Sequence, residues 1–584
     1  MRVVLLVFRR IEKSPSGGLC LSWRRAARLC DAEKLSTGRA HWVIYTFLGG
    51  WERLTLKSLL QVGRMAFCPK ENLYLGYMRK VESLIVCMGL GLAGLVACSS
   101  SPAPATESPE PLATVESSAK AKPAAADALP ASYKDIKYPD YKYVAPYPKD
   151  YRVELAEGIS GYIVVDRSLP LVNFSVYFEN PRVPAEIKDE AASQMVGSMF
   201  RRGGGEQISA HALDDTLEFI SAGLSTSVGT WISSFSVNSL TKDFGTMLDL
   251  AQKVILAPAF DKEQLEIVKT NFVTAYEQRY DTPAKVLSAL RQKANVLPCP
   301  RLWDANSEEY KKVSVDDLKR LSQGAFAKGR VVFALSGDID RDSAVTVLKD
   351  FFAKWNVAGL DPKAKPLFSA PEPLSFVNKP GIYVVDKDIT QANISLNQPF
   401  VKRPHPDYYP TAVANFILGG GSFSSRLMTR VRSDEGLAYH ISSRAGNDYR
   451  DTAMISINLQ TKVESASLAL KLIYEEIEKL AKEGPSEEEL AMAKKTLVES
   501  LPSEFDSPAS TAAIFASNEL IGKSFDHYLD YVKEINAVTA EQVKAMIAKY
   551  YAKDKMTISV VGPVSKLDAL KPFTVVPLDS LDFR

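Results

Sequence analysis

The residues of this chain that could do chemistry are few, and their spacing excludes two common kinds of site. After residue 98 the sequence holds only the histidines His211, His405, His440 and His527, and no two of them lie four positions apart. A zinc site built on one helix needs two ligands at that spacing. Gly419–Gly421 could cradle a phosphate, but no Lys-Ser or Lys-Thr follows. We expect no unaided zinc catalysis and interpret the three glycines as a close-packed turn.

Arg432 and Tyr439 are candidates for a binding pair, because a guanidinium binds carboxylates and a phenol donates hydrogen bonds. Ser424 or Ser425 can cap a short helix that ends at Gly436, which places Arg432 in its last turn and Tyr439 on the strand just beyond. The two side chains can then converge. Spacing alone is explained at least as well by structural roles, with Arg432 as a cation at a helix C-terminus and Tyr439 as a half-buried strand aromatic.

The segments that must position these residues form an internal repeat. In each copy a Ser or Thr opens a helix, an acid or amide follows three residues later, and an apolar strand closes at a glycine 23 residues after the opening residue. The copies run from Ser314 to Gly337 and from Thr539 to Gly562, an offset of 225 residues. Gly161–Asp166 and Gly381–Asp386 match with an offset of 220, which indicates a small insertion.

We therefore predict an α+β fold of two homologous lobes, in each of which helices lie on one face of a mainly antiparallel sheet. A length of 584 residues also exceeds what one core usually supports. The first lobe is expected at residues 136–360 and the second at residues 378–584. Residues 361–377, which contain four prolines, are the expected hinge linker. Two similar lobes joined in this way would form a clamp.

Residues 1–77 differ from the rest: they carry a surplus of eight positive charges and no sustained periodicity. We interpret them as a mis-annotated upstream extension, with translation starting at Met78. A basic start, an apolar run and small residues before Cys98 are typical of a lipoprotein signal peptide at residues 78–97, with Cys98 acylated. The alternative is a buried N-terminal helix that ends in an ordinary cysteine. Residues 98–135, rich in Ser, Pro and Ala, are expected to be a flexible tether.

Charge and cysteine content narrow the class of protein further. Without residues 1–97 the formal charge changes from +2 to −7, so no nucleic-acid footprint remains. If Cys98 is acylated, Cys299 stands alone and no disulfide is available within the chain. Ser99 after the cysteine indicates, by resemblance to lipoprotein sorting rules, the outer membrane of a bacterial envelope, if the cell has one. Ser99 leaves open which side the chain faces, and we expect the periplasmic side.

Four ordered motifs in the second half resemble those of a known family: His405–Tyr409, Asn415–Gly421, Ser425–Leu427 and Arg432–Tyr439. They are similar to the C-terminal domain of the pitrilysin/insulinase family of zinc peptidases, particularly its short two-domain members related to mitochondrial processing peptidase. The resemblance covers essentially all of residues 140–570, and it implies peptide substrates.

The same resemblance points to a degenerate metal motif in the first lobe. The family carries His-x-x-Glu-His on a helix there, with two histidines as zinc ligands and the glutamate as general base. Aligning Met199–Gly204 with the family's segment after that motif places Gln194, Gly197 and Ser198 at the three positions. A further glutamate ligand falls near Ala275. Gln and Ser are poor zinc ligands and Gly has no side chain, so the resemblance implies no zinc in this chain.

The resemblance also assigns roles to Arg432 and Tyr439. In the family these groups face the zinc, where arginine holds a substrate carbonyl or carboxylate and tyrosine donates to the oxyanion. In two-chain members one subunit brings zinc and base and the other brings Arg and Tyr. This chain would then be a lipid-anchored, non-zinc-binding subunit of a heteromeric peptidase for extended peptides, inactive without a partner chain that bears His-x-x-Glu-His and the zinc.

A rival hypothesis, from a different class, is a non-enzymatic envelope clamp that binds peptides or scaffolds a complex. Under this hypothesis Arg432 and Tyr439 have packing roles only. Strand alternation places His440 on the face opposite Tyr439, and we expect His440 to be structural under both hypotheses.

Overall fold

The architecture comes from a computed structural model, which describes residues 12–13, 19–20, 132, 143–360, 363, 365–377 and 379–584. Residues 131–584 form one compact unit, and its fold follows. The expected signal peptide, Cys98 and almost all of the expected extension and tether lie outside the described residues. Within the described ranges, no helix has the length and apolar character needed to cross a bilayer.

The first half of this unit contains a six-stranded sheet with the strand order β3-β4-β9-β5-β8-β7. β4 and β9 are parallel, and all other neighbours are antiparallel. The strands are β3 (Arg152–Ala156), β4 (Ile159–Val165), β5 (Leu171–Glu179), β7 (Gly223–Val228), β8 (Ile232–Leu240) and β9 (Val331–Gly337).

The second half repeats this arrangement in a sheet with the order β13-β14-β12-β15-β11-β16. β11 is parallel to β15, which pairs antiparallel with β12, just as β4 pairs with β9 and β9 with β5. The strands are β11 (Gly381–Asp386), β12 (Gln391–Pro399), β13 (Ala438–Ala445), β14 (Met454–Lys462), β15 (Thr557–Gly562) and β16 (Thr574–Val575). The predicted fold class, two homologous α+β lobes with mainly antiparallel sheets, is confirmed.

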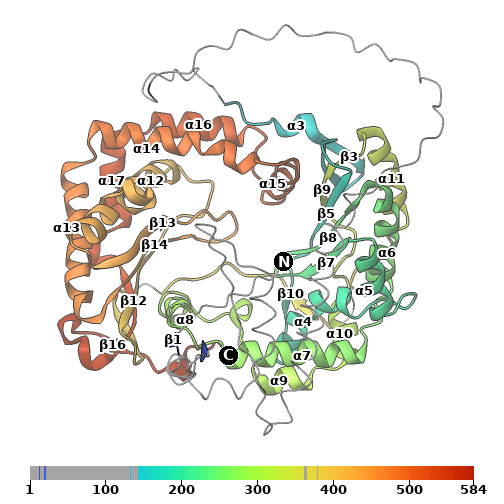
Figure 1. The fold of residues 1–584 in the computed structure, drawn as a ribbon, viewed down its shortest axis with the longest axis horizontal. Helices are drawn as coiled ribbons and strands as arrows, with labels where there is room; N and C mark the ends of the chain where they lie inside the picture. The colour runs from blue at the N-terminus through green and yellow to red at the C-terminus, as the bar shows by residue number, and fades with distance from the viewer. Residues whose placement is uncertain are drawn as a thin grey trace. The chain divides into compact units, whose positions relative to one another are not determined.

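Most helices of each half pack on one face of its own sheet; in the second lobe α12, α13 and α17 share one core with the strands (Figure 1). In the first half the main helices are α4 (Glu190–Arg202), α5 (Ala210–Phe219), α6 (Phe244–Leu256), α7 (Lys262–Glu277), α8 (Pro283–Asn295), α9 (Ser307–Lys312), α10 (Val315–Ser322) and α11 (Arg341–Ala353). In the second half they are α12 (Tyr408–Asn415), α13 (Ala466–Glu483), α14 (Glu487–Glu499), α15 (Pro508–Leu520), α16 (His527–Ala537) and α17 (Ala540–Tyr550).

One helix from each half crosses to the sheet of the other half. α15 packs on β4 and β9 of the first sheet (Figure 1), where Phe515 meets Tyr162 and Val332. In return, α8 packs on β15, β12 and β11 of the second sheet through Val286 and Leu290. β9 is therefore buried on both faces, which explains why its sequence is a continuous apolar run rather than an alternating one.

Candidate functional site

The segment that carries Arg432 and Tyr439 is held against the edge strand β13 by close packing. α12 continues into a π-helical turn at Phe416–Gly420. A Cβ on Gly419 would lie 2.7 Å from the Cβ of Ser443, so only glycine lets this turn reach the strand. The Ser443 hydroxyl donates to Asn415 Oδ1 at 2.6 Å, and Asn415 Nδ2 donates to the Ser443 carbonyl at 3.2 Å. The expectation that the three glycines are close-packed is confirmed.

A short helix then returns toward the strand. Arg426 anchors its start, donating from Nε and Nη2 to the two Glu489 carboxylate oxygens at 2.7 Å each. The helix continues as the π-helical segment Met428–Asp434 and ends at Gly436, whose φ of 61° is the left-handed conformation that glycine adopts at helix ends. Arg432 lies in its last turn and Tyr439 on β13, both as predicted.

Ser425 precedes the helix as predicted, with extended backbone and a carbonyl that accepts from the Thr429 N–H, but its side chain does not cap the helix. The hydroxyl of Ser424 donates to the Gly421 carbonyl at 2.8 Å, and that of Ser425 donates to the Ser422 carbonyl at 2.7 Å. Both hydroxyls close the preceding 3₁₀ turn at Ser422–Ser424 and make no side-chain cap to the helix. The sequence pattern failed here because a serine can bond to its own turn as easily as to the next helix.

Arg432 and Tyr439 do converge. The Arg432 guanidinium carbon lies 5.4 Å from the centre of the Tyr439 ring and 4.9 Å from the centre of the Phe423 ring. Tyr439 is 82% exposed and Phe423 is 69% exposed, so Tyr439 is not the half-buried strand aromatic of the structural alternative. Both rings and the guanidinium line a cavity of about 420 Å³.

His440 contradicts the expectation from strand alternation. Ala438 pairs with Thr461, whereas His440 pairs with Gln460, so the register shifts by a β-bulge at Tyr439. Tyr439 and His440 are in consequence both exposed, and both line the same cavity. The sequence did not predict His440 as a cavity residue, because a β-bulge leaves no signal in the alternation of polar and apolar residues. It did not predict Phe423 either, because a single aromatic residue in a glycine-rich turn is usually a packing residue.

The degenerate metal positions lie on α4, and the groups present there do not fit zinc. The Gln194 amide donates to a Glu190 carboxylate oxygen at 2.7 Å and accepts from the Tyr310 hydroxyl at 2.6 Å. The Ser198 hydroxyl turns back to donate to its own helix at the Met195 carbonyl. Within the described residues no three His, Cys, Asp or Glu side chains gather to hold a metal ion.

Gly197, at the position expected for the general base, has no room for a side chain. A Cβ there would lie 2.5 Å from the backbone nitrogen of Val228 on β7, and the Thr226 hydroxyl donates to the Gly197 carbonyl at 2.7 Å. Ala275, at the position expected for a further ligand, is exposed on α7 and offers no donor atom. The groups at these four positions do not fit a zinc site.

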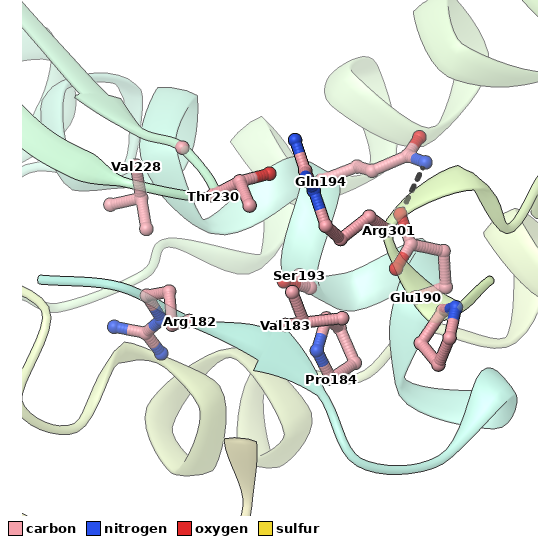
Figure 2. A pocket seen from close by; sticks show the side chains of 11 residues that line it. Arg182, Val183, Pro184, Glu190, Ser193, Gln194, Val228, Thr230 and Arg301 are labelled. Carbon is pink, nitrogen blue, oxygen red and sulfur yellow. Dashed lines mark hydrogen bonds between the residues drawn. The ribbon is translucent and has the colours of Figure 1, made fainter. Parts of the chain in front are cut away.

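A second, smaller cavity of about 110 Å³ lies beside these positions. Figure 2 shows the Gln194–Glu190 hydrogen bond on one side of this cavity, whose lining also includes Arg301 and Thr230. Burial raises the pKa of the Glu190 carboxyl, against the hydrogen bond from Gln194, which lowers it. Arg301 itself is held by a two-pronged ion pair with Asp451 of the second half.

Residues 312–497 match the family model described as the peptidase M16 inactive domain. A relative named non-peptidase homolog YmxG from Helicobacter pylori is 25% identical over 57% of this chain and 78% of its own length. The uncharacterized zinc protease YmxG of Bacillus subtilis is 26% identical over 54% of this chain and 75% of its own length.

Solved structures show the same fold. The peptidase M16 inactive domain from Pseudomonas fluorescens has a TM-score of 0.59 and 25% sequence identity, and the match covers 71% of this chain and 98% of that one. A protease from Helicobacter pylori has a TM-score of 0.58 at 15% identity, over 69% of this chain and 97% of that one, which supports the fold alone. This chain therefore has a pitrilysin-like fold, and residues 312–497 are similar to the inactive domain of M16 peptidases.

Proposed function

We propose that this chain is the non-catalytic subunit of a heteromeric pitrilysin-like peptidase, whose partner is a homologous chain that bears His-x-x-Glu-His and holds the zinc. The observation that carries the proposal is the contrast between the two sites. The metal positions on α4 are occupied by engaged or excluded groups, whereas Arg432 and Tyr439 line an open cavity. A subunit that supplies binding groups to the active site of another subunit needs exposed binding residues but no metal site of its own.

The chemistry of the pair supports a role in substrate binding. Among the described residues no carboxylate is paired with Arg432; its polar contact is with the Met428 sulfur at 3.8 Å, and two aromatic rings flank it. The guanidinium is free to hold a carbonyl or carboxylate of an extended peptide. The Tyr439 hydroxyl has no hydrogen-bond partner in the described part of the chain and can donate to an oxyanion.

The proposed setting is the bacterial envelope. Acylation of Cys98 would anchor the subunit to the outer membrane facing the periplasm, and residues 98–135 would tether the folded part to that anchor. This part of the proposal rests on the sequence, and metabolic labelling with a fatty-acid analogue, compared between the native chain and Cys98→Ser, tests it.

The central test is reconstitution. The chain alone is expected to show no zinc stoichiometry and no peptide hydrolysis, whereas the complex copurified from native membranes is expected to contain zinc and to cleave unfolded peptides. Chelator-sensitive hydrolysis by the chain alone would refute the proposal. In the complex, Arg432→Ala and Tyr439→Phe should each lower kcat about 100-fold or more if they stabilise the oxyanion.

Arg430 provides a matched control for these variants. It lies in the same helix but points into an ion pair with Glu435. Arg430→Ala should leave kcat within about twofold, because exposed ion pairs of this kind contribute little. If all three variants retain the native kcat, the roles of Arg432 and Tyr439 are structural only.

The alternative, a non-enzymatic envelope clamp, is favoured by one observation: a relative over more than half of this chain is named a non-peptidase homolog. Under that function the copurified complex would bind unfolded peptides without cleaving them. A neighbouring reading frame that encodes His-x-x-Glu-His favours the peptidase subunit, and its absence favours the clamp.

A further inference from the structure

The β-bulge at Tyr439 changes the composition of the cavity beside β13. The bulge brings the His440 imidazole to the cavity that Arg432, Tyr439 and Phe423 line. Its Nε2 lies 3.2 Å from the Ser442 hydroxyl, and its other ring nitrogen has no partner among the described residues. His440 therefore offers a further polar group to whatever enters the cavity.

The cavity is lined by one permanent charge, that of Arg432. Its lining contains Arg432 and His440 and no aspartate or glutamate. Elsewhere in the described chain, buried or half-buried arginines such as Arg301, Arg320 and Arg426 each bind a carboxylate through two hydrogen bonds. Arg432 lacks such a partner within the described residues, so the cavity is complementary to an anionic group that the chain itself does not supply.

The residues that line the cavity limit which chemical groups can lie beside the anionic group. Phe423 and Met428 are apolar, and Gly419 and Gly420 present backbone only on their side of the cavity. A volume of about 420 Å³ falls within the range of small-ligand sites and admits one or two amino-acid residues rather than a folded domain. β13 is an edge strand, so its outer backbone groups are also open to an extended chain.

We propose that His440 is a third ligand-binding residue of this site and that the site takes a carboxylate of a peptide, next to an apolar or aromatic side chain. The carboxylate can be the C-terminus of the peptide or an acidic side chain. This inference rests on the proposed function in so far as peptides are the ligands, but it assigns a ligand preference and a residue that the peptidase hypothesis does not require.

Fluorescence anisotropy with the chain alone tests the inference. The probes are three labelled short peptides rich in Gly and Ser: one that ends in Phe with a free carboxylate, its C-terminal amide, and the amide with a Glu before the Phe. The free-acid peptide should bind more tightly than the amide. Recovery of affinity in the Glu-containing amide would show that a side-chain carboxylate suffices, and no recovery would restrict the site to C-termini.

Variants assign the effect to His440. His440→Ala should weaken binding of the free-acid peptide about tenfold, as expected for one hydrogen bond to a charged group, and should leave the amide unchanged. His440→Gln, which keeps a donor, should recover part of the loss, and His211→Ala on the exposed face of α5 is the control. Equal affinities for acid and amide, an unchanged His440→Ala variant, or no saturable binding of any probe would each overturn the inference.

The result is separable from the proposed function. Hydrolysis by the copurified complex that depends on Arg432 but shows no carboxylate preference would leave the subunit role intact and reject this inference. Carboxylate binding by the chain, together with a copurified complex that contains no zinc and cleaves no peptide, would support this inference and reject the subunit role.

Discussion

Gly197 of α4 lies so close to Val228 of β7 that a Cβ on the glycine would be 2.5 Å from the valine's backbone nitrogen. In the family that this chain resembles, the equivalent position is expected to carry the general base. The helix and the strand lie so close at this glycine that no side chain has space there.

Gly197→Ala should accordingly destabilise the chain by about 1–3 kcal/mol, because backbone atoms cannot move aside as a flexible side chain can. Urea denaturation at neutral pH measures the change. Gly245, on α6, is the matched control: a Cβ there meets nothing within 4 Å, so Gly245→Ala should be neutral or stabilising by up to about 1 kcal/mol. Equal effects at the two glycines would show that the α4–β7 contact is looser than its distance implies.

Glu519, near the end of α15, joins that helix to the first sheet. Its carboxylate accepts hydrogen bonds from Arg152 at 3.0 Å, from the Ser160 hydroxyl at 2.8 Å and from the Tyr162 hydroxyl at 2.6 Å. Burial raises the pKa of Glu519, but these hydrogen bonds and the Arg152 charge outweigh it and hold the pKa below the ordinary value of 4.5.

A depressed carboxyl pKa means that the unfolded state binds the proton more tightly. The stabilisation is therefore complete above about pH 4.5 and is lost as the pH falls through the folded-state pKa. Glu519→Gln should cost about 1.5–3 kcal/mol at neutral pH and should flatten the loss of stability below pH 4.5. Glu499→Gln, at an exposed ion pair on α14, should change neither quantity. A Glu519→Gln variant with the native acid profile would contradict this role.

Local patterns in the sequence predicted the repeat because each is completed within a few residues. The Ser314–Asp317 and Thr539–Gln542 pairs form the expected capping boxes, and the helix that bears Arg432 ends where Gly436 indicated. The convergence of Arg432 with Tyr439 could be predicted from this helix end, because only a short segment of chain separates the two residues.

Features that depend on distant segments could not be predicted. No pattern in α8 or α15 indicates that each helix covers the sheet of the opposite half, because an amphipathic helix does not encode which apolar surface it meets. The bulge at Tyr439 is set by the pairing of β13 with β14, so the alternation rule misplaced His440 by assuming a regular strand.

His527, at the start of α16, should make the second lobe sensitive to acid. Burial, and then the nearby charges of Lys523 and Arg403, lower the pKa of His527 to about 3. The imidazole is neutral in the folded chain, whereas the unfolded chain takes up a proton below about pH 6.5. Stability should therefore fall as the pH decreases from about 6.5 to about 3, because protons bind preferentially to the unfolded state.

Replacing the imidazole with a ring that does not titrate should remove this dependence. His527→Phe keeps the aromatic contact with Tyr528, whose ring centre lies 5.1 Å away, and should show a flatter plot of Tm against pH between 6.5 and 3. His211→Phe, at an exposed position on α5, should reproduce the native slope. An unchanged slope in His527→Phe would assign the acid sensitivity to carboxylates alone.

The Arg301–Asp451 pair should behave as a buried ion pair that fastens the two halves. The two hydrogen bonds measure 2.9 and 2.7 Å, and the side chains are only 11% and 8% exposed. Asp451→Asn should cost about 3–5 kcal/mol in urea denaturation, because it leaves a buried guanidinium without its counter-charge. The double replacement Arg301→Met with Asp451→Leu should cost less than Asp451→Asn, because it removes both charges together.

For comparison, Glu308→Gln breaks the exposed pair with Lys311 and should cost at most about 1 kcal/mol. A double replacement as damaging as the sum of its single changes would show that the two groups act independently and that the halves are held by their apolar contacts.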